Sequence, residues 1–164
     1  MKKTKKIDFS KIQFVLMDLD GVLTDGSVIY SSTGEMLKAF NAHDGFGINR
    51  GREHGLKFAI ISGMSAKANE IRAERLKIEE LYQNCGDKTE AAKEIKQKYS
   101  LTDENLCFMG DDVFDIPLLQ QVAFSAHLLS YGLNLRAEGQ CPVEHYPQES
   151  WSFVKGERSA SDND

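Results

Sequence analysis

Three short, continuous apolar runs set the strongest constraint on the fold of this 164-residue chain. They occupy residues 14–17, 58–61 and 106–109. Apolar residues follow one another in each run instead of alternating with polar ones, which is typical of strands covered on both faces of a parallel sheet. Residues 65–76 and 88–99, which lie between the runs, have the composition of helices. This alternation predicts right-handed βαβ crossovers and a doubly wound, Rossmann-like α/β sheet.

A β-hairpin is predicted between the first two strands. Residues 28–30 and 36–40 flank a loop that contains Gly34, which is the pattern of two short strands joined by a turn. A loop over residues 41–47 then leads into a helix that ends near His54. Because this insertion is short, we expect no separate cap domain.

The last third of the chain is less regular. Residues 117–122 predict a helix and residues 123–126 a short strand, and apolar periodicity fades after them. We therefore expect a single folded domain over residues 12–130, preceded by a basic tail over 1–11. Residues 131–164 are expected to be poorly ordered, because they are polar and lack a clear pattern.

Composition excludes several classes of protein. The formal net charge of −5 argues against binding to nucleic acid or to an anionic membrane. No apolar run approaches the roughly 20 residues that span a bilayer, and the basic N-terminus lacks the apolar region of a signal peptide. Three cysteines without a Cys-x-x-Cys pair indicate a reducing compartment and no zinc site. We expect a cytoplasmic protein.

Polar residues follow the predicted strands in a chemically suggestive set. Ligands of open α/β sheets bind beyond the carboxyl ends of the strands, so these residues should converge there. Several carboxylates in one cleft need a compensating cation, and hard oxygen ligands without Cys or His favour Mg²⁺. The residues that should meet are Asp18, Asp20, Ser62, Lys88, Asp111, Asp112 and Asp115.

Two of these aspartates suit a phosphoryl-transfer reaction. Asp18, the first residue after the first strand, could attack phosphorus and form an aspartyl phosphate. Asp20, two residues further, could protonate the leaving alkoxide and later deprotonate the attacking water. Asp111, after the third strand, would complete the metal shell.

The other residues supply positive charge and hydrogen bonds. Ser62 and Gly63 follow a strand and precede a helix, where a hydroxyl and backbone N–H groups can receive phosphate. Lys88 could neutralise both the nucleophile and the phosphate. Asp112 and Asp115 could support the metal shell or orient Lys88.

Simpler interpretations exist for each residue alone. Asp18 and Asp20 could form a turn, Ser62 could cap a helix, and Lys88 could be a solvated helix residue. Arg72 and Arg75 lie on one face of a helix, either as solvated charges or as a clamp for a substrate carboxylate. The joint occurrence of the set at three strand ends favours a reaction site.

The order and spacing of four motifs resemble a known family. They are FVLMDLDGVLTDG at 14–26, ISG at 61–63, GDK at 86–88 and GDDVFDIP at 110–117. The chain resembles the haloacid dehalogenase superfamily of phosphatases over residues 12–126, and its short hairpin resembles the capless branch. Within that branch, the resemblance is to phosphatases of eight-carbon sugar-acid phosphates that serve lipopolysaccharide precursor synthesis.

This resemblance implies a cofactor, a substrate and an assembly. Mg²⁺ would be held by the side chains of Asp18 and Asp111 and by the carbonyl of Asp20. Asp18 would be the nucleophile and Asp20 the acid and base, acting on a small phosphorylated sugar acid. A homotetramer is also implied, in which neighbouring subunits cover the open sites.

Two departures from the family pattern leave alternatives open. Met64 stands where these phosphatases often carry Arg and where phosphatases of nine-carbon sugar-acid phosphates carry Glu. Residues 141–147 replace the usual glycine-rich ending. The alternatives are therefore a nine-carbon (nonulosonate 9-phosphate) substrate, or a non-catalytic assembly domain of the same fold.

Overall fold

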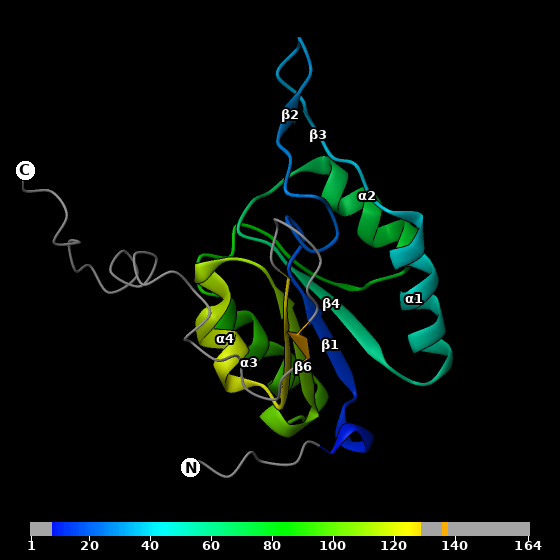
Figure 1. Ribbon diagram of the computed structural model, residues 1–164, viewed down its shortest axis with the longest axis vertical. Coiled ribbons are helices and arrows are strands. Elements are labelled where there is room, and N and C mark those ends of the chain that lie inside the picture. The colour runs from blue at the N-terminus through cyan, green and yellow to red at the C-terminus, as the bar shows by residue number, and fades with distance from the viewer. Residues whose placement is uncertain (1–7, 129–135, 138–164) are drawn as a thin grey trace, which may run out of the picture.

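A parallel sheet forms the centre of the molecule (Figure 1). The computed structural model describes residues 8–128 and 136–137. The sheet has the strand order β5-β4-β1-β6-β7-β8, in which β8 is the antiparallel strand. Its strands are β1 (Phe14–Met17), β4 (Lys57–Ile61), β5 (Glu80–Tyr82), β6 (Leu106–Gly110), β7 (Phe124–His127) and β8 (Arg136–Ala137). The three apolar runs form strands of this parallel sheet, as predicted, and the structure places them side by side as β4, β1 and β6.

Helices cover both faces of this sheet (Figure 1). Side chains alternate along β1, so that Leu16 faces one helical layer and Met17 the other. The Leu16 layer contains α3 (Lys88–Tyr99) and α4 (Ile116–Gln121), and the Met17 layer contains α1 (Ala42–Glu53) and α2 (Lys67–Leu76). The prediction of a doubly wound α/β fold is confirmed.

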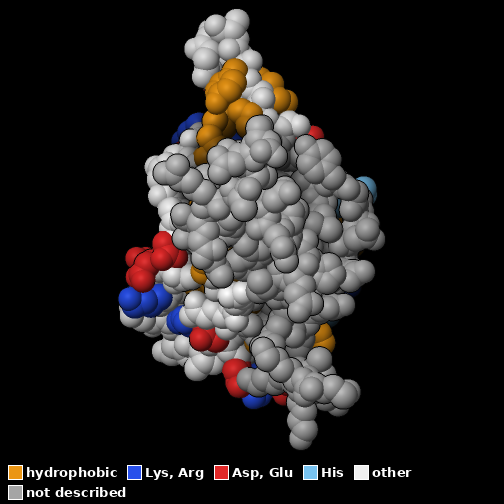
Figure 2. All heavy atoms as spheres, turned by 60° about the vertical axis from the view of Figure 1, so that its left-hand side comes forward, with side chains coloured by type: hydrophobic (Ala, Val, Ile, Leu, Met, Phe, Trp, Pro, Cys, Tyr) orange, Lys and Arg blue, Asp and Glu red, His pale blue; other side chains and the backbone are white. Residues whose placement is uncertain are grey.

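The predicted hairpin is formed by β2 (Ile29–Tyr30) and β3 (Met36–Leu37), which pair antiparallel. It projects from the carboxyl ends of the central strands (Figure 1). Its apolar side chains are exposed and form an orange patch at the top of the molecule in Figure 2; they belong to Val28, Ile29, Tyr30 and Leu37. No cap domain is inserted in residues 8–128.

The structure differs from the prediction in several local details. Strand β5 was not predicted, and α1 begins at Ala42 instead of after Gly47. The side chain of Asn41 accepts a hydrogen bond from the backbone N of His43 at 2.9 Å and so caps the earlier turn. The N-terminal boundary also differs, because Phe9–Lys11 forms a short 3-10 helix.

Most residues at the two ends of the chain lie outside the ranges that the structure describes. Residues 1–7 of the expected basic tail are outside the described residues. Arg136–Ala137 pairs with β7, whereas the rest of the segment 131–164, which was expected to be poorly ordered, is also outside them. No helix in the described ranges is long and apolar enough to cross a membrane.

Candidate active site

The register of the central strands brings the motif loops together. Met17, the last residue of β1, pairs with Ile60 of β4 and with Met109 of β6. The backbone N of Asp18 continues this ladder and donates to the carbonyl of Met109 at 2.8 Å. The loops that carry Asp18 and Asp111 therefore leave the sheet side by side.

Three carboxylates meet at this point. One oxygen from each of Asp18, Asp111 and Asp115 lies within 4.8 Å of the others. Gly21 makes this approach possible, because a Cβ built on it would lie 1.8 Å from Oδ2 of Asp111. Gly110 is similar, since its Cβ would lie 2.4 Å from Oδ2 of Asp115. The chain thus packs glycine backbone against the carboxylates.

Lys88, the first residue of α3, is the cation of this cluster. Its Nζ lies 2.9 Å from Oδ1 of Asp18 and 2.5 Å from Oδ1 of Asp115. The other oxygen of Asp115 accepts from the backbone N of Asp111 at 2.9 Å and of Asp112 at 3.2 Å. Asp115 is fully buried and orients both Lys88 and the loop. Asp112 is exposed and accepts from the backbone N of Val113.

Burial and neighbouring charges shift the pKa values of the cluster residues. Burial raises the pKa of Asp18, an effect that Lys88 opposes and Asp115 reinforces. Burial alone would lower the pKa of Lys88, but the charges of Asp115 and Asp18 outweigh it and raise that pKa. Lys88 is therefore an ammonium at neutral pH. Three carboxylates with one ammonium leave two negative charges when all are ionised, which suits a divalent cation.

The oxygens of Asp18 are differentiated. Oδ1 receives the ammonium of Lys88 at 2.9 Å and the backbone N–H of Leu19 at 2.7 Å. Both of these contacts use the same oxygen, so the two carboxylate oxygens of Asp18 lie in different surroundings. Asp111, on the neighbouring loop, faces the same cluster.

Ser62 and Gly63 stand at the carboxyl end of β4, as expected. Ser62 is buried, and its hydroxyl donates to the carbonyl of Met64 at 3.0 Å and accepts from its backbone N at 3.2 Å. Gly63 and Met64 are exposed. The hydroxyl of Ser62 is thus engaged in a local turn in this structure.

Among the described residues, the cluster of Asp18, Asp111 and Asp115 does not include Arg72 or Arg75. Arg72 donates to the carbonyl of Asn41 at 2.7 Å, and its guanidinium lies 5.0 Å from the centre of the Phe40 ring. It thereby ties α2 to the start of α1. Arg75 is exposed on α2. Their assignment to a substrate carboxylate remains a prediction.

Asp20 has a partner that the sequence analysis missed. The ammonium of Lys38 lies 2.6 Å from Oδ1 and 2.7 Å from Oδ2 of Asp20. Lys38 directly follows β3, and its side chain is 3% exposed. The available signal was a single charged residue within residues 36–40, a segment otherwise apolar and predicted to be a strand.

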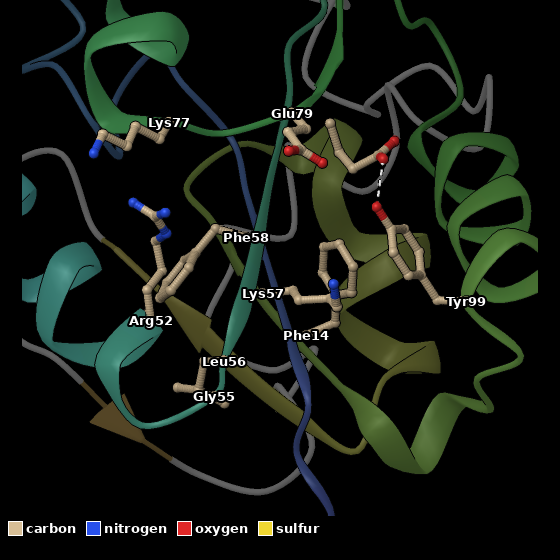
Figure 3. A pocket seen from close by; sticks show the side chains of 10 residues that line it. Phe14, Arg52, Gly55, Leu56, Lys57, Phe58, Lys77, Glu79 and Tyr99 are labelled. Carbon is tan, nitrogen blue, oxygen red and sulfur yellow. Dashed lines mark hydrogen bonds between the residues drawn. The ribbon is translucent and has the colours of Figure 1, made fainter.

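Among the described residues, cavities lie at both ends of the strands. One of about 560 Å³ is lined by the loop after β1, by the return of the hairpin and by the start of α1. The other, of about 320 Å³, lies at the amino ends of β1, β4 and β5 (Figure 3). The hydroxyl of Tyr99, labelled in Figure 3, donates to the Glu80 carboxylate there at 2.6 Å. The first cavity is the one beside the loop of Asp18 and Asp20.

Comparison with known proteins identifies close relatives. No family model matches the chain. It is 39% identical over 114 residues to the 3-deoxy-D-manno-octulosonate 8-phosphate phosphatase KdsC of Escherichia coli K12, a match that covers 70% of this chain and 61% of that protein. The chain thus matches about three-fifths of the length of this curated relative.

Solved structures agree with this result. A probable yrbi family phosphatase from Pseudomonas syringae has a TM-score of 0.72 and 33% identity, covering 79% of this chain and 78% of its own. The 3-deoxy-D-manno-octulosonate 8-phosphate phosphatase from Moraxella catarrhalis has a TM-score of 0.68 and 33% identity, covering 70% and 67%. That structure is a complex with a magnesium ion, a phosphate ion and a KDO molecule.

Proposed function

Because this chain belongs to the family of the 3-deoxy-D-manno-octulosonate 8-phosphate phosphatases, within the haloacid dehalogenase superfamily, we propose that it hydrolyses the phosphate ester of a small sugar acid. The observation that carries the proposal is the buried cluster of Asp18, Lys88 and Asp115 beside Asp111. It combines a potential nucleophile, a cation and a second metal-binding carboxylate at the carboxyl end of a parallel sheet.

The proposed cofactor is Mg²⁺. The side chains of Asp18 and Asp111 and the carbonyl of Asp20 would hold it. The site fits a divalent cation in two respects: Gly21 leaves space for the Asp111 carboxylate, and the cluster carries surplus negative charge. When bound, Mg²⁺ would neutralise charge on the transferring phosphoryl oxygens. Asp115 would not be a ligand, because Lys88 and two backbone amides occupy its oxygens.

The first step transfers the phosphoryl group to the protein. A carboxylate oxygen of Asp18 forms a bond to phosphorus, and the bond between phosphorus and the ester oxygen breaks. The proton of the Asp20 carboxylic acid passes to that oxygen, so an alcohol leaves. Lys88 keeps its contact with Oδ1 of Asp18 and holds the nucleophile in place.

The second step returns the protein to its starting state. The Asp20 carboxylate takes a proton from water while the water oxygen bonds to the phosphorus of the aspartyl phosphate. The bond from phosphorus to the Asp18 oxygen breaks, which releases inorganic phosphate and leaves Asp20 protonated for the next cycle. Ser62 and Gly63 would supply hydrogen bonds to the phosphoryl oxygens, after the turn at Met64 opens.

The proposed substrate is 3-deoxy-D-manno-octulosonate 8-phosphate, a precursor in lipopolysaccharide synthesis. The cavity of about 560 Å³ beside the loop after β1 would take its sugar acid. A nine-carbon sugar-acid phosphate is the second candidate substrate, because Met64 stands where phosphatases of the eight-carbon substrate often carry Arg. A non-catalytic assembly domain is less well supported, because the carboxylates and Lys88 are all present and in contact.

We also propose that the chain assembles as a homotetramer in the cytoplasm. The exposed apolar residues of the hairpin support an assembly, because such a projecting patch is typical of a surface that another subunit covers (Figure 2). A neighbouring subunit would also shield the uncapped site from water.

A phosphate-release assay tests the proposed function. The chain should hydrolyse the eight-carbon sugar-acid phosphate faster than the nine-carbon one, and EDTA should suppress both reactions. Asp18→Asn should keep the fold, measured by circular dichroism, and lower kcat by at least about 10⁴-fold, since an amide in place of the carboxylate cannot attack phosphorus. A folded and fully active Asp18→Asn variant, or silence toward a broad panel of phosphate esters, would refute the proposal.

A further inference from the structure

The hairpin contributes one buried charge to the candidate site. Leu37, the neighbour of Lys38, is 45% exposed, whereas the Lys38 side chain is 3% exposed. Covering a lysine side chain removes hydration from its ammonium and freedom from its four-carbon stem. An unpaired ammonium would be unstable there. Both oxygens of Asp20 lie within 2.7 Å of Nζ and compensate for this loss.

Two lysines therefore serve two different aspartates of the site. Lys88, from α3, contacts Asp18 and Asp115. Lys38, from the hairpin, contacts Asp20, which is 33% exposed at its side chain. The nucleophile and the proposed acid and base thus have separate cations, carried by elements that are far apart in sequence. Lys38 connects the hairpin to the proposed acid and base.

We propose that Lys38 is a positioning residue for Asp20, an inference that rests on the function proposed above. In the acid form of Asp20, one oxygen carries the proton and the other accepts from Lys38. After the proton has passed to the ester oxygen, both carboxylate oxygens accept from the ammonium, which is the arrangement in this structure. Lys38 fixes the direction of the carboxyl group and stabilises the charge that forms on it as the proton leaves.

This role makes a specific prediction about leaving groups. A poor leaving group needs a proton as its bond to phosphorus breaks, whereas a good one leaves as the anion. Loss of Lys38 should therefore slow the hydrolysis of esters with poor leaving groups far more than the hydrolysis of esters with good ones. A role in fold stability, or in binding the phosphate, would slow both kinds of ester alike.

The test compares phenyl phosphate with 4-nitrophenyl phosphate, which have similar shapes and no carboxylate. Lys38→Met should lower kcat/KM about 10- to 100-fold for phenyl phosphate and less than about 3-fold for 4-nitrophenyl phosphate. Lys38→Arg, which keeps the cation, should recover most of the loss. The matched control is Lys96→Met, which removes a lysine 2.6 Å from Asp103 outside the site and should change neither value.

A double variant separates positioning from an independent role. If Lys38 acts through Asp20, Asp20→Asn with Lys38→Met should hydrolyse phenyl phosphate no more slowly than Asp20→Asn alone. Equal losses on both esters in Lys38→Met, or additive losses in the double variant, would overturn the inference. Retained 4-nitrophenyl phosphate activity reports that the variant is folded. If the wild-type chain hydrolyses no ester, the proposed function fails instead.

Discussion

At the scale of single residues, Gly21 shows how the backbone makes room for the cluster. Its φ of +86° is rare for residues with a side chain, and its missing Cβ leaves space for Asp111. Gly21→Ala should displace the Asp111 carboxylate and lower kcat/KM about 100-fold. Isothermal titration with Mg²⁺ should show a matching loss of affinity.

Gly34 provides the matched control for this substitution. It has a similar φ of +83° in the hairpin loop, but no atom lies within 4 Å of a Cβ built on it. Both alanine variants should lose about 1–2 kcal/mol of stability to backbone strain. Only Gly21→Ala should lose activity and Mg²⁺ binding. Normal Mg²⁺ affinity in Gly21→Ala would show that the space beside Gly21 is not needed for Mg²⁺ binding.

The sequence predicts the residues that follow the central strands, because parallel strand ends meet at one edge. Asp18, Asp111, Asp115 and Lys88 do lie together. Lys38 was missed because its contact with Asp20 depends on how the hairpin folds back, which no spacing encodes. The partners of Arg72 also depend on tertiary packing, here against Phe40 and Asn41.

At the scale of elements, β5 is held to α3 through a buried carboxylate. Glu80 accepts from the hydroxyl of Tyr99 at 2.6 Å and from Lys98 at 2.5 Å. Burial opposes ionisation of Glu80, but these donors prevail and lower its pKa. The bond to Glu80, with burial, raises the pKa of Tyr99 to about 12. The network therefore needs a protonated Tyr99 and an ionised Glu80.

This bond gives stability a defined pH dependence. The pKa of Tyr99 is about 10 in an unfolded chain and about 12 in the fold, so its contribution is full below pH 10 and lost as the pH rises toward 12. Tyr99→Phe should lower the stability by about 1 kcal/mol at pH 8. Urea unfolding should show that the difference from wild type shrinks above about pH 10.

Tyr30→Phe, on the exposed hairpin, controls for loss of a hydroxyl group as such. Its unfolding midpoint should follow the wild type at every pH. A gap between Tyr99→Phe and wild type that stays constant from pH 8 to pH 11 would contradict the assigned role.

Helices and strands could be predicted from the sequence where the local apolar pattern matches the burial of the side chains in the fold. The span of α3 was predicted residue for residue, because its apolar spacing matches its buried face. Strand β5 was missed because it has three residues and begins with the charged Glu80, whose burial depends on donors from α3. The hairpin strands are shorter than predicted, since Lys38 leaves β3 and turns toward Asp20.

At the scale of the whole molecule, the hairpin presents an exposed apolar surface. Ile29 and Leu37 are register partners, so they lie on the same face. Ile29→Lys combined with Leu37→Lys should convert the proposed tetramer to smaller species in sedimentation velocity. The thermal stability of the subunit should change little, because both side chains are 45% exposed.

Thr33→Lys adds a charge to the exposed tip of the same hairpin and serves as the control for that experiment. It should leave the sedimentation profile unchanged. A tetramer that persists in the double lysine variant would place the subunit interface elsewhere.

The position of Lys38 on a projecting hairpin has a consequence for inhibitor design. A compound wedged beneath the hairpin would bend it outward and draw the ammonium away from Asp20. Turnover would slow although the ligand would not replace the phosphate at Asp18. Such an inhibitor would compete with the sugar acid for the cavity beside the hairpin, and it would not need the charge that makes phosphate mimics cross membranes poorly.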